Sequence, residues 1–211
     1  MYTFLRIFAL FWIVALCAGT IQYLSFKPDV DFLKLKQAAV QTGYYLPAFY
    51  SHIFASSIIL LAGFFQFSKR VYNNRPLHRA LGKVYILGIL LFAAPGAYVM
   101  SFFINRGAGV FISFMLQNTL WIVFTIAAWV KIKKGDVQGH VNMMRRSYAL
   151  AFAAVMLRLY IWLLSVAGMG VQFENNYLII AFLSWVPNLA VAELINFRAK
   201  TAVLTMVNKD H

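Results

Sequence analysis

The feature that most constrains this chain is a series of six long apolar stretches. A helix of roughly 20 residues crosses the hydrocarbon core of a bilayer. The stretches are continuously apolar, whereas strands of a membrane β-barrel alternate between apolar and polar residues. The sequence therefore predicts one integral membrane domain over residues 1–211, an all-α polytopic bundle. Its spans are expected near residues 4–25, 45–67, 82–104, 110–132, 148–169 and 176–197.

The composition agrees with a chain that is surrounded mainly by lipid. Hydrophobic residues make up 62% of the chain and charged residues only 12%, whereas about a quarter of a soluble domain is charged. The net charge of +13 could indicate a nucleic-acid ligand. The basic residues, however, sit in short clusters between apolar runs, where they act as topology signals and bind lipid headgroups. We expect the lipid bilayer as partner and no nucleic acid.

Basic residues also predict the orientation of the helices. If the spans alternate, fourteen Lys and Arg residues lie on one side and four on the other, with Arg158 inside a span. Positive residues remain in the cytoplasm, so both termini are predicted to be cytoplasmic, with anionic headgroups at the basic loops. The fourteen are Arg6, Lys69, Arg70, Arg75, Arg79, Lys83, Lys131, Lys133, Lys134, Arg145, Arg146, Arg198, Lys200 and Lys209; the four are Lys27, Lys34, Lys36 and Arg106.

The first apolar stretch has a second interpretation. A signal peptide cleaved after residues 1–19 would also carry a basic residue such as Arg6 and small residues near its end. The stretch is longer than the usual core of a signal peptide, which favours a retained span. The single cysteine, Cys17, excludes an internal disulfide. After this span, residues 31–36 are predicted to form a short amphipathic helix at the interface.

An arginine inside the fifth span requires an explanation, because charges at membrane depth are costly. Small residues at helical spacing predict that Arg158 points into the bundle. Pro187 should kink the sixth span and free a carbonyl beside Asn188. One interpretation is that Arg158 pairs with Glu193, Asn188 or such a carbonyl and fixes two helices together. The other is a buried site for a substrate, a proton or an anionic cofactor.

Two further polar residues, His52 and Gln117, are expected at similar depth in the second and fourth spans. A hydrogen bond between them inside the bundle is the simpler interpretation. The functional alternatives are metal or haem ligation, a proton relay, or hydrogen bonding to a quinone.

His78 and His140 form a second histidine pair. Pro76 predicts that a helix begins before the third span enters the membrane, and Asp136 is a plausible cap ahead of the fifth span. Each histidine therefore lies near the cytoplasmic start of a helix. Two imidazoles on separate helices could bind the iron of haem b, with Arg79 and Arg145 holding its propionates. The same groups could instead bind lipid phosphates, and two histidines alone argue against structural zinc.

Several motifs over residues 45–197 resemble an uncharacterised family of bacterial multipass membrane proteins, which contains a domain of unknown function. That resemblance implies a bacterial cytoplasmic (inner) membrane location and this order of helices, without an agreed activity. The motifs are His52 in a span that ends in Gly63–Phe67, Leu77–Gly82 around His78, His140 followed by Met144–Leu150, Arg158, and Trp185–Asn188 with Glu193.

The chain is also similar, more weakly, to the transmembrane di-haem cytochromes b. Those proteins carry paired ligand histidines on their second and fourth helices and on their third and fifth helices. His52, His78 and His140 match three of these positions in order, and Gln117 stands at the fourth. An amide is a poor iron ligand, so the resemblance implies at most one haem, between His78 and His140.

Three functions remain open at this stage. The first is a membrane redox protein that binds one haem or a quinone near the cytoplasmic face. The second is a carrier or sensor that uses a buried site of Arg158, His52, Asn188 and Glu193, although no paired interruptions of the inverted-repeat transporter type are expected. The third is a non-catalytic accessory protein, alone or as a homo-oligomer. The sequence contains no nucleophile motif or phosphate loop, and enzymatic activity stays undecided.

Overall fold

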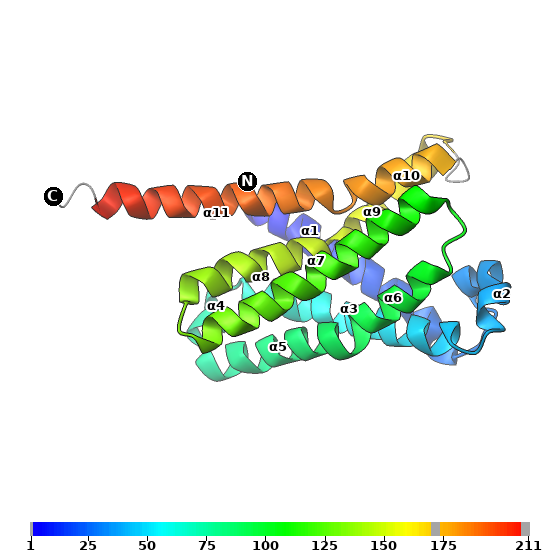
Figure 1. The fold of residues 1–211 in the computed structure, drawn as a ribbon, viewed down its shortest axis with the longest axis horizontal. Helices are drawn as coiled ribbons and strands as arrows, with labels where there is room; N and C mark the ends of the chain where they lie inside the picture. The colour runs from blue at the N-terminus through cyan, green and yellow to red at the C-terminus, as the bar shows by residue number, and fades with distance from the viewer. Residues whose placement is uncertain (1, 170–173, 208–211) are drawn as a thin grey trace.

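The computed structural model describes residues 2–169 and 174–207. All regular elements within these residues are helices, and six of the helical segments are long and apolar enough to cross a membrane. Figure 1 shows these segments side by side in one bundle. The predicted all-α bundle with six spans is confirmed. The orientation of the termini stays a prediction, and Lys209 lies outside the described residues.

Three of the spans are continuous helical segments close to the predicted ranges. They run without a break because no glycine pair disturbs them and Pro47 lies in the first turn of its helix, where a missing amide costs no helical hydrogen bond. These spans are α1 (Tyr2–Thr20), which continues as η1 (Ile21–Ser25), α3 (Tyr45–Gln66) and α7 (Ala108–Lys133).

The other three spans are interrupted within the described residues, whereas the sequence predicted an interruption only at Pro187. The third contains a π-helical segment, and the fifth and sixth each break into two helices. The third and fifth also begin well before residues 82 and 148. The third span consists of α5 (Arg75–Gly88), η3 (Ile89–Ala93) and α6 (Ala94–Phe102); the fifth of α8 (Val137–Ala151) and α9 (Ala153–Val166); the sixth of α10 (Glu174–Leu183) and α11 (Val186–Val207).

The two early helix starts follow from capping. The side chain of Asn74 accepts a hydrogen bond from the Leu77 amide, and Pro76 occupies the first turn of α5. Asp136 accepts a bond of 2.7 Å from the Gly139 amide at the start of α8. Both caps satisfy amides that the first helical turn leaves without partners. The predictions for Pro76 and Asp136 are confirmed.

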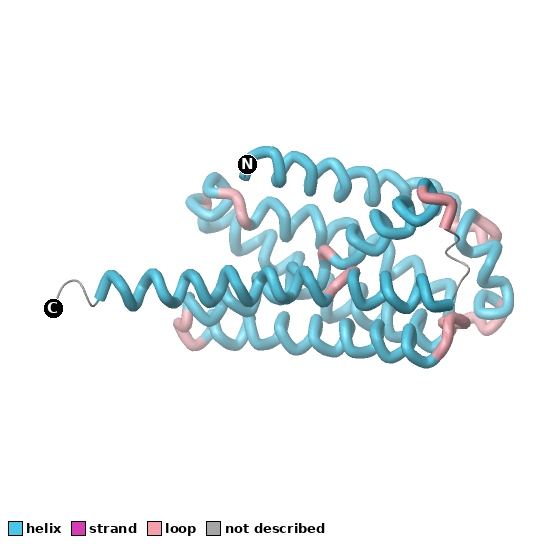
Figure 2. The backbone as a smooth tube through the Cα atoms, turned by 90° about the horizontal axis from the view of Figure 1, so that it is seen from above, coloured by secondary structure: helices cyan, strands magenta, loops and turns pink. Residues whose placement is uncertain are grey.

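Short helices lie at the two ends of the bundle. We call the end formed by α4 (Lys69–Asn73), the first turns of α5 and the α7–α8 turn the basic end. At the opposite end lie η2 (Asp31–Lys36), which confirms the predicted short helix in 3₁₀ form, and α2 (Gln37–Val40). Figures 1 and 2 show α11 continuing past the basic end, beyond the other helices.

The core lies among α3, α5, α7 and α8, and close helix packing depends on glycine. A Cβ atom added at Gly63 would lie 2.5 Å from ring carbons of Tyr148 and 2.9 Å from a ring carbon of Tyr85. One added at Gly96 would lie 2.5 Å from the Ala48 carbonyl oxygen. Small residues let membrane helices approach closely, and these two glycines bring α3 against α8 and α6.

Candidate functional site

His78 and His140 lie in the first turns of α5 and α8, together at the basic end of the bundle. Each ring is half-buried, and the two imidazoles are near enough for their charges to interact. The caps at Asn74 and Asp136 set where the two helices begin. The sequence prediction that this pair shares one level of the bundle therefore agrees with the structure.

The ring of His140 is oriented by the backbone of α7. Its Nδ1 atom lies 2.9 Å from the carbonyl oxygen of Ala128. A carbonyl oxygen only accepts hydrogen bonds, so Nδ1 carries the proton and the neutral ring keeps a lone pair on Nε2. Histidines that ligate metals are held in this way, with the second nitrogen donating to a carbonyl.

His78 is placed by its neighbours but lacks a partner for one ring nitrogen. Its ring packs edge-on against Tyr72, with the centroids 5.8 Å apart, and its carbonyl accepts a 3.0 Å bond from Gln66 Nε2. The Nδ1 atom is buried and has no hydrogen-bond partner among the described residues. Buried polar atoms are nearly always bonded, so this atom marks a place where a ligand, water or proton is expected.

A buried chain of hydrogen-bonded hydroxyl groups lies two helical turns further into the bundle than the histidine pair. Tyr85 and Ser147 follow His78 and His140 by seven residues each, which is about two helical turns, so they lie on the same faces. Tyr85 Oη lies 3.0 Å from Ser147 Oγ, and Ser147 Oγ lies 2.8 Å from Thr125 Oγ1. All three side chains are fully buried. The sequence analysis missed this chain, although hydroxyl residues seven positions from each histidine are a detectable pattern.

Two arginines of α8, Arg145 and Arg146, are bound to α11. Arg145 Nη1 donates to Asn196 Oδ1 at 3.1 Å, and Asn196 Nδ2 donates to the Asn142 carbonyl at 3.3 Å. Arg79 is exposed beside His78. Of the two arginines predicted to hold a ligand, Arg79 therefore presents an exposed side chain, and Arg145 is engaged in fixing α8 to α11.

Glu193 has a different partner from the one that the sequence suggested. Its two carboxylate oxygens accept hydrogen bonds from Nε and Nη2 of Arg146, in an ion pair between α11 and α8. The guanidinium of Arg146 also lies over the Phe124 ring, 5.7 Å from its centroid. The proposed pairing of Arg158 with Glu193 is wrong, because Glu193 is bound by Arg146 of α8.

Arg158 does not point into the bundle as predicted; its side chain is exposed on α9. The prediction projected one continuous helix through Ala151 and Ala154, but the span is divided at Phe152 into α8 and α9. The carrier site that required Arg158 and Glu193 together is therefore not assembled.

The predicted hydrogen bond between His52 and Gln117 is also absent. His52 Nδ1 lies 2.7 Å from the carbonyl oxygen of Ala93, and Gln117 Nε2 donates to the Leu150 carbonyl at 3.3 Å. Ser51 Oγ donates to the Phe92 carbonyl at 3.2 Å. Each side chain bonds a backbone carbonyl at or beside a helix interruption.

Asn188 likewise bonds backbone carbonyls, at the break of the sixth span. Its amide nitrogen donates to the Ser184 carbonyl at 2.8 Å and to the Ala149 carbonyl of α8 at 3.3 Å. The kink predicted from Pro187 is confirmed as a break between Leu183 and Val186. The π-helical segment of the third span had a comparable signal in Pro95, which cannot donate to the carbonyl four residues earlier.

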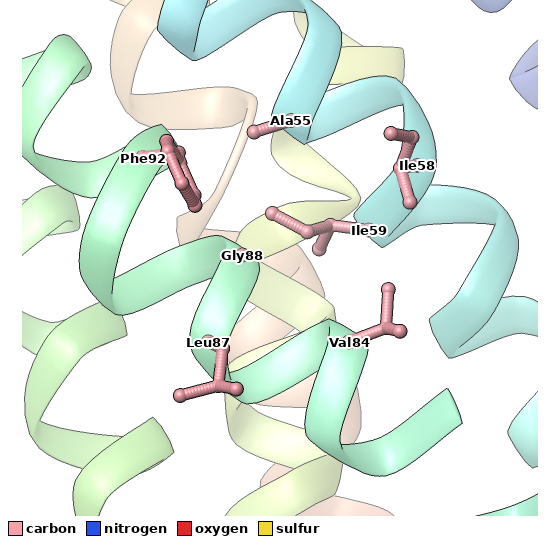
Figure 3. A pocket seen from close by; sticks show the side chains of 7 residues that line it. All are labelled: Ala55, Ile58, Ile59, Val84, Leu87, Gly88 and Phe92. Carbon is pink, nitrogen blue, oxygen red and sulfur yellow. The ribbon is translucent and has the colours of Figure 1, made fainter. Parts of the chain in front are cut away.

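One groove on the outer face of the bundle is separate from the histidine pair. It has a volume of about 250 Å³ and lies between α3 and the α5–η3 segment, as Figure 3 shows. Ile58, Leu87 and Phe92 are exposed, so the groove opens outward. It offers hydrocarbon contact without charged groups. Its lining is Ala55, Ile58, Ile59, Val84, Leu87, Gly88 and Phe92.

The donor set of the histidine pair fits a haem iron. No group of three or more His, Cys, Asp or Glu side chains that could hold a metal ion occurs within the described residues. The imidazoles of His78 and His140, on different helices, would hold the iron of a b-type haem without a third protein ligand. The bonded Nδ1 of His140 and the unpartnered, buried Nδ1 of His78 are both consistent with that use.

Comparison with known proteins gives one finding. A family model described as "Predicted membrane protein (DUF2306)" matches residues 49–196, which is more than half of the chain. Comparison with curated proteins and comparison with solved structures each give no match. The matched range contains all nine residues that the sequence predicted for a site: His52, His78, Arg79, Gln117, His140, Arg145, Arg158, Asn188 and Glu193. The similarity to di-haem cytochromes b stays a prediction.

Proposed function

The chain belongs to the DUF2306 family of predicted membrane proteins, and we propose that it is a membrane redox protein that holds one b-type haem between His78 and His140. It is a multipass membrane protein with six apolar helical spans. We further propose that it resides in a bacterial cytoplasmic membrane with both termini in the cytoplasm, which places the basic end and the histidine pair at the cytoplasmic face.

One observation carries this proposal. The Nδ1–H of His140 bonds the Ala128 carbonyl at 2.9 Å, which presents Nε2 as a ligand, while His78 on the neighbouring helix start keeps a buried nitrogen without a described partner. A haem bound by these two rings would accept and release one electron at a time. His140 does not need to change its tautomer to serve as a ligand.

The surrounding residues have defined tasks in this proposal. The Ala128 carbonyl orients the His140 ring, and the Tyr72 ring supports the His78 ring from its edge. Arg79 is the exposed cation next to His78 and is suited to bind a propionate. The Tyr85–Ser147 hydrogen bond joins the helices that carry the two histidines, two turns further into the bundle.

The test is an absorption spectrum of the detergent-purified protein, expressed with a sufficient haem supply. We expect a Soret band that His78→Ala and His140→Ala each abolish. The matched control is His52→Ala, which removes an imidazole that bonds Ala93 and should leave the band in place. Circular dichroism and gel filtration of each variant establish that the helices and the monodisperse state are retained.

A folded, monodisperse wild-type protein that remains colourless after haem supply and reconstitution would contradict the proposal. If such a protein instead retains a quinone on solvent extraction, and His78→Ala releases that quinone, the pair is a quinone site. A Soret band that survives both single substitutions would show that haem is bound elsewhere.

A further inference from the structure

We propose that a groove between α1 and the basic end of α3 binds an anionic phospholipid, with Arg6 on the phosphate and an acyl chain along the apolar wall. The groove has a volume of about 250 Å³. A single cation and a short hydroxyl residue line it together with large apolar side chains. The lining residues are Thr3, Arg6, Ile7, Leu10 and Phe64.

The cation is positioned at the level where lipid headgroups are expected. The guanidinium of Arg6 lies 6.0 Å from the centroid of the Phe64 ring, near the last turn of α3. The basic residues Lys69 and Arg70 follow directly after this turn. A guanidinium binds phosphate oxygens through two parallel hydrogen bonds, which a lysine does not reproduce. Arg6 therefore supplies a specific contact as well as a positive charge.

The apolar part of the groove continues from the cation along the helix. Thr3, Arg6 and Leu10 are three and four residues apart and thus lie on one stripe of α1, beside Ile7. The groove changes from polar to apolar in the direction of the bundle centre. A ligand with a charged head and a hydrocarbon tail matches this order, whereas a soluble anion would contact only the polar end of the groove.

Access to the groove is lateral, from the bilayer. Only 6% of the apolar window of the first span is buried inside the bundle, compared with 44% for the second span. Helix α1 is therefore a peripheral helix with most of its surface facing lipid. The groove of Figure 3 has the same volume of about 250 Å³ but no charged lining residue. It is expected to accept any acyl chain, so selectivity for charge should depend on Arg6.

The test is native mass spectrometry of the full-length protein with phosphatidylglycerol and with phosphatidylcholine of identical acyl chains. We expect the first phosphatidylglycerol to bind several-fold more tightly than phosphatidylcholine. Arg6→Gln should weaken that binding roughly fivefold, as expected for the loss of one basic residue near a headgroup. Lys69→Gln removes the same charge at the same end, outside the groove, and should change the binding by less than half of that factor.

A second variant separates a lipid site from a plain phosphate site. Leu10→Trp fills the apolar wall and should weaken phosphatidylglycerol binding while Arg6 remains. In the wild-type protein, glycerol phosphate at equal concentration should not displace the lipid. Equal loss of binding in Lys69→Gln and Arg6→Gln would overturn the proposal, as would efficient displacement by glycerol phosphate or unchanged binding in Leu10→Trp. None of these readouts depends on whether haem is present.

Discussion

Tyr85 on α5 and Ser147 on α8 share a hydrogen bond of 3.0 Å between two fully buried side chains. The bond joins the two helices whose first turns carry the histidine pair. Ser147 also lies 2.8 Å from Thr125 Oγ1, so one hydroxyl connects three helices. The position of the candidate site therefore depends on a polar contact in the membrane interior, two turns away from it.

The Tyr85–Ser147 bond predicts unequal effects of two substitutions. Tyr85→Phe should lower the free energy of unfolding by about 1 kcal/mol, because Ser147 keeps its bond to Thr125. Ser147→Ala should cost about 1–3 kcal/mol, because the buried Tyr85 hydroxyl loses its partner. Equilibrium unfolding in mixed micelles measures both values. Equal losses in the two variants would contradict the proposed hydrogen-bond chain.

The close approach at Gly63 predicts a steric effect. Gly63→Ala places a methyl group 2.5 Å from the Tyr148 ring and should lower the unfolding free energy by about 1–3 kcal/mol. The matched control is Gly19→Ala, because nothing lies within 4 Å of an added Cβ at that helical position. The control should be neutral or slightly stabilising, as alanine favours helix more than glycine. A neutral Gly63→Ala would show that Tyr148 can move away without cost.

The Arg146–Glu193 ion pair predicts coupling between α8 and α11. The side chains of Arg146 and Glu193 are 21% and 47% exposed, so solvent screens their attraction only in part. Arg146→Gln and Glu193→Gln should each destabilise the protein, and the double variant should lose less than the sum. We expect a coupling energy of about 1 kcal/mol from the double-mutant cycle. Additive losses would mean that the two residues stabilise the bundle independently.

The α7–α8 turn should be sensitive to acid. The pKa of Asp136 is lowered because its carboxylate accepts hydrogen bonds from the Lys131 ammonium group and from the Gly139 amide. Because the folded pKa lies below the unfolded value of about 3.9, the stabilisation is present above that value and is lost as pH falls through the folded pKa. Amide hydrogen exchange in the first turn of α8 should become faster in that pH range, after correction for the intrinsic pH dependence of exchange.

A substitution at the same position provides the control for this pH effect. Asp136→Asn keeps an oxygen for the Gly139 amide but removes the titrating charge. Exchange in this variant should be faster than in wild type at neutral pH and should lose the additional acid dependence. An acid dependence that persists in Asp136→Asn would assign it to another group.

Much of the fold could be predicted because lipid imposes simple rules. Helices and closed β-barrels satisfy backbone groups in a bilayer, and these stretches lack the alternation of barrel strands, so six apolar stretches predict six helical spans. Helix caps and prolines are also local, and Asp136, Pro76 and Pro187 each marked a feature that the structure contains. These signals act over one or two turns and need no knowledge of neighbouring helices.

The partners of the buried polar groups depended on the tertiary structure. His52, Gln117 and Asn188 bond backbone carbonyls of other helices, and every residue has a carbonyl, so no side-chain pattern marks the partner. Arg158 was misplaced because its face was projected through Phe152, where the structure divides the span into two helices.

The sequence by itself determined the membrane environment, the number of spans and the level of the His78–His140 pair, since each follows from local hydrophobicity and helix start signals. Only the tertiary structure decided which polar groups meet. Hydrogen bonds reach about 3 Å, so small shifts in helix phase and depth change the partner, and those shifts arise from packing between helices distant in the chain.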